Sequence, residues 1–211
     1  NALYHKLFAT RQERGALEFN TQETDILFDQ HGHIEAVVPV VRNDAHKLIE
    51  EMMLAANVCA AKLIIKQEVP GVFRNHEPPA ADRVLTLVTS LAGFGAKVKL
   101  SGTPTSSEYR ECLEQLSERL DAGLLQNLLL RSMNQARYEA DCKGHFGLSY
   151  QEYTHFTSPI RRYPDLLVHR CLRYLIRNKQ GPNLLRVTGS KRLKKENWLI
   201  LKQEDLETVA A

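Results

Sequence analysis

The sequence predicts an α/β protein of the α+β type, in which helices pack on a mostly antiparallel sheet. Apolar residues recur at steps of three and four over long stretches after residue 43, which is typical of amphipathic helices. Short apolar segments on either side of a glycine turn precede them and indicate antiparallel strands. Because the 211 residues are 43% hydrophobic and 25% charged, the chain has the composition of a globular protein with a real core.

The first 41 residues predict one helix and three strands. Residues 3–14 form an amphipathic opening that Gly15 is expected to end. Apolar-rich segments then follow at residues 16–19, 25–28 and 34–41, and each is expected to form a strand. The turn at residues 30–33 contains Gly32, which can adopt a positive φ, so the second and third strands should form a hairpin.

The strongest helical pattern runs over residues 43–66. Asn43 or Asp44 is expected to be its N-cap, because a short polar side chain there can accept from the free amides of the first turn. Its expected buried face holds five residues at helical spacing: Leu48, Met52, Ala55, Cys59 and Leu63. Val69-Pro70-Gly71 should break this helix.

The rest of the chain alternates helices with short extended segments. Residues 72–74 should be extended, and Pro78-Pro79 should introduce a helix that ends near Gly93 or Gly95. A polar loop is expected at 101–107, helices at 109–120, 124–133 and 166–178, a strand and loop at 145–153, and one more helix start at 204–207.

The charge, the apolar runs and the cysteines of the sequence argue against a membrane-spanning or secreted protein. A net charge of +3 is too small to identify a nucleic-acid binder, so the argument depends on where the charges gather. No apolar run approaches the roughly 20 residues of a membrane span, and no signal-peptide pattern opens the chain. The cysteines Cys59, Cys112, Cys142 and Cys171 form no C-x-x-C pair, which favours reduced, buried thiols in a cytoplasmic protein. We also expect the protein to be a monomer. Since the chain begins inside an amphipathic segment without methionine, we expect it to be a piece of a longer protein.

The most informative segment is HFTSPIRRYPDLLVHR, residues 155–170. Ser158-Pro159 and Tyr163-Pro164 are helix-entry signals, whose free amides would form an anion site beside the two arginines that lie between them. On the following helix three arginines fall at i, i+3 and i+7, opposite apolar positions that should turn inward. These arginines are Arg170, Arg173 and Arg177, and the inward residues are Val168, Leu172 and Leu175. A solvated helix face is an equal alternative for the three arginines.

This segment resembles the signature of the ribonuclease II/ribonuclease R family, the 3′-to-5′ exoribonucleases that degrade single-stranded RNA. RNDAHKLIEE at 42–51 and GHFGL at 144–148 are also similar to that family, nearer to ribonuclease R, and the three motifs occur in the family's order. The resemblance implies that residues 1–180 are the C-terminal portion of an RNB-like catalytic domain. Residues 181–211 would be the end of that domain, before any S1 domain. It also implies processive release of nucleoside 5′-monophosphates.

The resemblance assigns roles to seven residues. Arg161 would stabilise charge beside the scissile phosphate, and Glu50 would contact the sugar of the terminal nucleotide. The others would bind RNA through phosphates or by stacking on bases: Phe19, Ser158, Arg162, Tyr163 and Arg170. Some of these residues also have purely structural explanations. Phe19 is equally typical of a core strand, Glu50 of a surface glutamate, and Tyr163, like Tyr153, of a packing tyrosine.

A metal site is not evident in this sequence. The family holds Mg²⁺ with four aspartates spaced D-x5-D-x-D-D, whereas the aspartates here are never closer than four positions. The pairs His31/His33 and His155/His169 lack a third ligand at convincing spacing. The resemblance therefore implies a magnesium-dependent full-length enzyme whose metal ligands lie outside this chain, and an inactive isolated chain.

Two other function classes remain open at this point. A non-catalytic module that binds single-stranded RNA would use the same basic segment without metal chemistry. A DNA-binding regulator would place the helix of Arg170, Arg173 and Arg177 in a groove, but no short turn-linked partner helix precedes it. Competition of labelled single-stranded RNA by duplex DNA separates these two classes.

Overall fold

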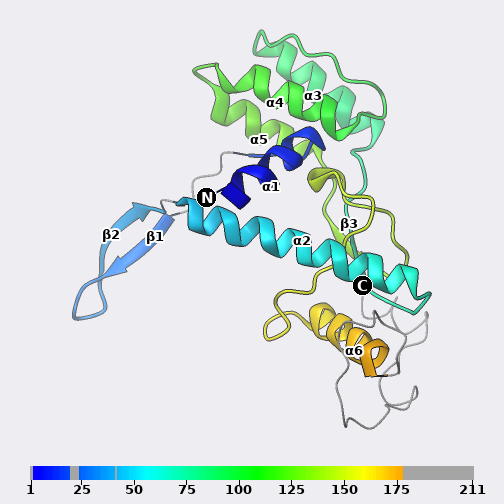
Figure 1. The fold of residues 1–211 in the computed structure, drawn as a ribbon. Helices are drawn as coiled ribbons and strands as arrows, with labels where there is room; N and C mark the ends of the chain where they lie inside the picture. Colours follow the sequence, from blue (N-terminus) through cyan, green and yellow to red (C-terminus); the bar gives the residue numbers. More distant parts are fainter. Residues whose placement is uncertain (1, 20–23, 41, 178–211) are drawn as a thin grey trace.

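The structure is a computed structural model that describes residues 2–19, 24–40 and 42–177. The long helix α2 crosses the molecule, with the group α3, α4 and α5 on one side and α6 on the other (Figure 1). The elements in chain order are α1 (Ala2–Glu13), β1 (Thr24–Phe28), β2 (Ile34–Pro39), α2 (Asp44–Lys66), β3 (Phe73–Asn75), α3 (Ala81–Gly93), α4 (Ser106–Ser117), α5 (Ala122–Ser132), β4 (Arg137–Glu139), the 3₁₀ helix η1 (Phe146–Leu148) and α6 (Tyr163–Arg177).

The strands form two separate antiparallel pairs, which confirms the mixed helical and antiparallel fold class. β1 pairs with β2 in a hairpin that projects from the body (Figure 1), and Gly32 in its turn has a φ of +82°. The Asp29 carboxylate accepts from the amides of His31 and His33 and so closes the turn. β3 pairs with β4, with Arg74 opposite Tyr138.

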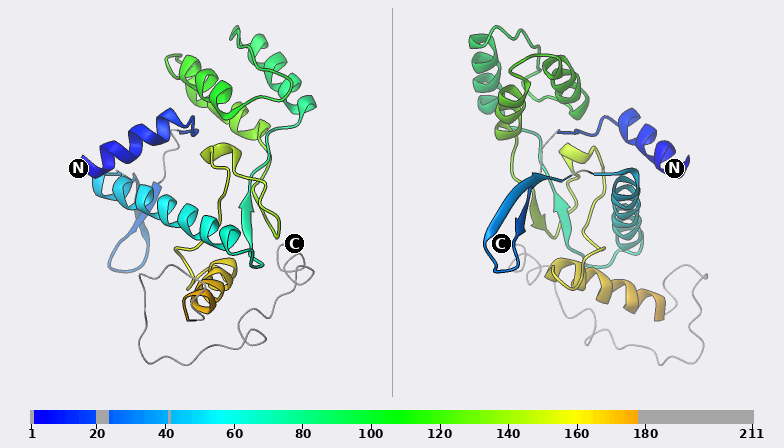
Figure 2. Two further views of the ribbon diagram at one scale, coloured as in Figure 1. Left: turned by 45° about the vertical axis from the view of Figure 1, so that its right-hand side comes forward. Right: turned by 90° about the vertical axis from the view of Figure 1, so that its left-hand side faces the viewer.

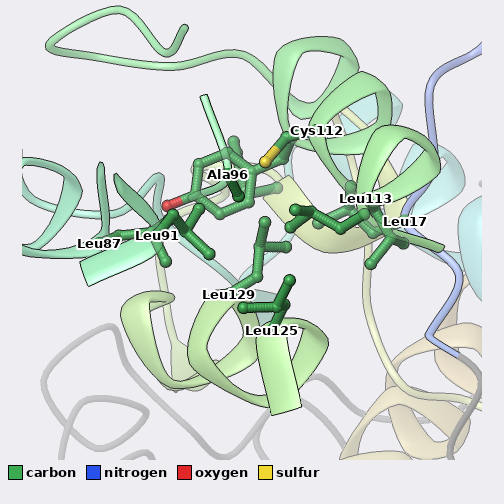
Figure 3. Close-up of a cluster of buried hydrophobic side chains, with 11 residues drawn as sticks. Leu17, Leu87, Leu91, Ala96, Cys112, Leu113, Leu125 and Leu129 are labelled. Carbon is green, nitrogen blue, oxygen red and sulfur yellow. The ribbon is translucent and has the colours of Figure 1, made fainter. Parts of the chain in front are cut away.

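Helices α3, α4 and α5 enclose one hydrophobic core (Figure 3). Leu91, Leu125 and Leu129 are fully buried there. α4 begins with a capping box, in which Thr105 accepts from the Glu108 amide and the Glu108 carboxylate accepts from the Thr105 amide. Leu17 and Phe146 also belong to this core, so the segment after α1 and the helix η1 are fixed to the three-helix group.

A second core joins α2 to α6, which lie side by side in both views of Figure 2. Ala60, Ala61 and Ile64 of α2 pack with Val168 and Leu175 of α6. The small side chains of the two alanines allow the two helices to approach closely. As predicted, Val168, Leu172 and Leu175 turn inward from α6.

The prediction of which face of α2 is buried is wrong. Met52, Ala55 and Cys59 are exposed, and Leu48 and Leu63 are only partly buried. The buried face holds instead Glu51, Leu54, Asn57, Ala60, Ala61 and Ile64. The apolar residues of α2 extend around more than one face, and two polar residues are buried because other segments satisfy their hydrogen bonds. The apolar pattern alone could not select the right stripe.

Several local expectations were also wrong. Residues 16–19 form no strand, because Leu17 makes a single backbone bond, to the Gly147 carbonyl at 2.8 Å. Residues 145–153 contain the 3₁₀ helix η1 and isolated bridges in place of a strand. The three-residue strand β4 was missed because it is too short to show an alternating pattern.

The four cysteines are free thiols, but their burial differs. Cys112 and Cys171 are buried as expected, whereas Cys142 is partly buried and Cys59 is exposed. Asn43 is the N-cap of α2, and its side chain accepts from the amides of Ala45 and His46. Within the described ranges, no helix is long and apolar enough to cross a membrane. The helix start expected at 204–207 lies outside the described residues.

We expect Leu125→Ala to lower the free energy of unfolding by about 2–5 kcal/mol, because a fully buried leucine is replaced by a cavity. Leu124→Ala is the matched control, since Leu124 is the adjacent residue of α5 and is 50% exposed. Urea denaturation followed by circular dichroism measures both. An equal loss in the two variants would contradict this account of the core.

Candidate functional site

The carboxylate of Asp165 fixes the turn that carries the basic segment. Asp165 is fully buried, and its Oδ1 accepts from the Ser158 amide at 2.8 Å and from Arg162 Nη2 at 2.8 Å. The amides of Arg161 and Arg162 donate to the Ser158 carbonyl. These two amides are therefore used within the turn and do not point outward.

The same turn exposes the side chain of Arg161 to solvent. Arg161 is exposed, and no carboxylate among the described residues lies within ion-pair distance of it. Its neighbour Ile160 is fully exposed. Arg162, by contrast, is directed inward by its ion pair with Asp165. The two adjacent arginines thus differ: one holds the turn, and the other is presented to solvent.

Asn57 of α2 attaches the segment that leads into this turn. Its amide Nδ2 donates to the Tyr153 hydroxyl at 3.0 Å, and its Oδ1 accepts from the Phe156 amide at 2.9 Å. The His169 ring forms a hydrogen bond with the Phe156 carbonyl at 2.9 Å and stacks on the Phe156 ring with centroids 4.3 Å apart. The segment is therefore held between α2 and α6.

A row of rings continues from this segment to the β3–β4 pair. Tyr150 stacks parallel to Tyr153, and Tyr153 meets the His155 ring edge-on at 5.7 Å. His155 Nδ1 and the Tyr138 hydroxyl are 2.6 Å apart. The Arg74 guanidinium lies 4.6 Å from the centre of the Tyr138 ring. Because each ring contacts the next, these side chains fix one another's orientation.

Burial keeps His155 of this row neutral, and also His145, whose ring meets the Tyr153 ring edge-on. Desolvation lowers the pKa of His145 to about 3, with a contribution from the nearby His76. Desolvation also lowers the pKa of His155 to about 4, and the positive charge of Arg162 acts in the same direction. Both rings are therefore uncharged at neutral pH. They pack within the fold and cannot act as cations toward a ligand.

Glu50 belongs to a separate ionic cluster at the start of α2. It pairs with Arg11, at 3.2 Å, and with Arg42. Arg11 also reaches the buried Glu51, at 2.7 Å. Glu50 lies two turns before Asn57 on the same face of α2, about 10 Å along the axis.

The structure brings most of the predicted site residues to one end of α6. Ser158, Arg161, Arg162 and Tyr163 lie on the turn and the first residue of α6, with Tyr163 54% exposed. Arg170 follows two turns later and is partly buried, with interactions of its own. Phe19 lies apart, partly buried against the three-helix core. The roles implied for these residues remain predictions.

Sequence reasoning missed the residues that hold the site together. Asn57 and Asp165 are polar residues within apolar helical stretches, and a buried polar residue needs partners that the sequence does not reveal. Tyr153 is 4% exposed, so it packs and is not free to stack on a base. Among the described residues, no group of three His, Cys, Asp or Glu side chains could hold a metal ion. His155 and His169 bind Tyr138 and the Phe156 carbonyl instead.

Comparison with known proteins places this geometry in a family. Residues 1–178 match the model of the RNB domain. Ribonuclease R of Vibrio cholerae is 48% identical over 181 residues, or 86% of this chain, and ribonuclease R of Escherichia coli is 44% identical over 179 residues, or 85%. The chain spans 22% of the length of each of these relatives.

A solved structure has the same fold. Mycoplasma genitalium ribonuclease R in complex with ribose-methylated single-stranded RNA superposes with a TM-score of 0.82 at 28% sequence identity. The match covers 98% of this chain and 31% of that protein. The same enzyme in complex with double-stranded RNA gives a TM-score of 0.83.

We expect Asp165→Ala to lower the free energy of unfolding by about 3 kcal/mol, because it leaves the Ser158 amide and the Arg162 guanidinium without their shared acceptor. Asp25→Ala is the control, since Asp25 is exposed on β1. Chemical denaturation of both variants provides the measurement. A loss below about 1 kcal/mol for Asp165→Ala would show that the turn does not depend on this carboxylate.

We expect stability to fall as the pH is lowered from about 6.5 to 5. The folded pKa values of His145 and His155 lie below their ordinary value of 6.5, so the unfolded chain binds more protons in this window. Their contribution is complete above pH 6.5 and is lost as the pH falls toward 4. In His155→Gln the dependence measured by thermal unfolding should become shallower. An unchanged slope would argue against a neutral buried His155.

Proposed function

This chain belongs to the RNB domain family, and we propose that it supplies the RNA-binding part of a 3′-to-5′ exoribonuclease that acts on single-stranded RNA. The observation that carries the proposal is the exposed Arg161, presented on a turn that the buried Asp165 holds in place. A guanidinium offers two parallel donors to a phosphate, so an arginine carried on a fixed turn can orient a phosphodiester as well as attract it.

In this proposal the residues of the chain have different roles. Arg161 stabilises the negative charge that develops on the scissile phosphate. Arg170, two turns along α6, and Tyr163 contact the RNA beside it. Arg162 acts by holding the turn, since one of its donors is already committed to Asp165.

Glu50 is proposed to accept from the 2′-hydroxyl of the last nucleotide. Arg11 and Arg42 each bind one of its carboxylate oxygens, which fixes the carboxylate and leaves a further lone pair on each oxygen. Phe19 is the weakest member of the set, because its ring already packs on the three-helix core. Processive action and nucleoside 5′-monophosphate products belong to the same proposal for the whole protein.

The magnesium that the resemblance implies does not fit the residues described here. The part of the chain seen in the structure holds no suitable group of acidic or histidine ligands. No step of this proposal therefore passes through a metal. The residues described here would bind the RNA, orient it and stabilise the negative charge on its phosphate.

We expect Arg161→Ala, made in the whole protein that carries this chain, to lower turnover of single-stranded RNA by about 100-fold while RNA affinity falls much less. Arg161→Lys is the matched variant, since it keeps the charge and loses the two-pronged geometry, and it should recover only part of the rate. Single-turnover hydrolysis and fluorescence anisotropy measure rate and affinity separately. Unchanged turnover would remove Arg161 from the mechanism.

The alternative is a module that binds single-stranded RNA without cutting it. It predicts that the whole protein binds RNA with an Arg161-dependent affinity but releases no mononucleotide when magnesium is supplied. Thin-layer separation of labelled products decides between the two functions.

A further inference from the structure

A second cationic site lies away from the signature turn. A cavity of about 670 Å³ opens between the start of α3, the end of α5 and the β3–β4 pair, and three arginines line it: Arg83, Arg131 and Arg137. This volume is in the range of small-ligand sites, about 300–1,000 Å³. Phe156, Ser158, Arg161 and Arg162 are not among its lining residues.

The β3–β4 pair separates the two sites. Arg137 is opposite Asn75 in the register, and the next pair is Arg74 opposite Tyr138. Successive side chains of a strand point to opposite faces, so Arg137 and Asn75 face the cavity while Arg74 and Tyr138 face His155. The cavity is therefore a separate site and not an extension of the signature turn.

The charges around the cavity favour an anion. Two carboxylates, Glu77 and Glu139, also line it, but both pair with Lys143, at 3.4 and 3.0 Å. The Asn75 amide donates to Glu139 as well, at 2.6 Å. Among the described residues, the three arginines have no carboxylate within ion-pair distance, although Arg137 is near enough to Glu139 to contribute to the lowered pKa of that carboxyl.

One of the arginines is also held in position. Arg83 Nη1 donates to the Met133 carbonyl at 3.3 Å, which leaves its other donors available. Three like charges gathered around one cavity repel one another, and an anion that binds among them relieves this repulsion. The side-chain amide of Gln135, which also lines the cavity, adds a neutral hydrogen-bond donor, whereas the Asn134 amide already donates one N–H to the Pro78 carbonyl at 2.6 Å.

We propose that this cavity binds a phosphate group, presented either by the backbone of an RNA strand or by a free nucleotide. Guanidinium groups match the geometry of phosphate oxygens, and amides donate to the same oxygens. The site goes beyond the exoribonuclease role proposed above, because it uses other residues on another face of the β3–β4 pair.

The test compares two double variants of the 211-residue chain. Arg131→Gln/Arg137→Gln removes two charges from the cavity, and both residues are exposed, so the fold should persist. Lys97→Gln/Lys99→Gln removes two exposed charges elsewhere and is the matched control. Calorimetry with AMP and with inorganic phosphate, and anisotropy with a labelled oligoadenylate, give the affinities. All are measured in an Arg161→Gln background, so that binding at the signature turn does not contribute.

If a free nucleotide is the ligand, the cavity variant should bind AMP and phosphate about tenfold more weakly, while the control changes by less than about twofold. If the RNA backbone is the ligand, oligoadenylate affinity should fall. The slope of log affinity against log salt should then decrease by about 1 to 2. Gln135→Glu, which adds a carboxylate and removes no arginine, should reproduce the loss.

Unchanged affinity for all three probes in the cavity variants, or an equal loss in the lysine control, would overturn the proposal. This failure is distinguishable from failure of the exoribonuclease proposal. That proposal is tested by turnover in the Arg161 variants of the whole protein, a measurement in which the cavity residues are unchanged.

Discussion

The buried carboxylate of Asp165 is the contact on which the candidate site depends. One oxygen accepts both the Ser158 amide and the Arg162 guanidinium, so a single side chain closes the turn and starts α6. A carboxylate without solvent must be paired or hydrogen-bonded, and here the pairing partner comes from the segment it organises. The consequence for function is that Arg161 projects from a fixed turn.

The turn would not be fixed without the long helix behind it. Asn57 binds Tyr153 and the Phe156 backbone from the middle of α2, and the α2–α6 core holds the other side. The ring contacts from Tyr150 to Tyr138 then connect this segment to the β3–β4 pair. A site formed from one short sequence motif thus depends on three elements that are distant along the chain.

The polar groups packed around the site are either neutral or paired. Neutral His145 and His155, with pKa values of about 3 and 4, fill positions where a charged ring would be costly. The ionic cluster of Arg11, Glu50, Glu51 and Arg42 connects α1 to α2 in a different way, through paired charges. Within the described residues these contacts are made without a large continuous sheet, because the strands there form two two-stranded pairs.

The sequence by itself determined the family, the fold class and the position of the basic segment. The motifs at 42–51, 144–148 and 155–170 are local, and helix caps such as Asn43 act within one turn, so both can be recognised without tertiary contacts. Only the tertiary structure decided which face of α2 is buried, that Arg162 is paired with Asp165 while Arg161 is exposed, and that Tyr153 is a packing residue. It also revealed the cavity of Arg83, Arg131 and Arg137. These outcomes depend on which segments distant in the sequence supply hydrogen-bond partners to buried polar groups, and periodicity along one helix carries no information about that.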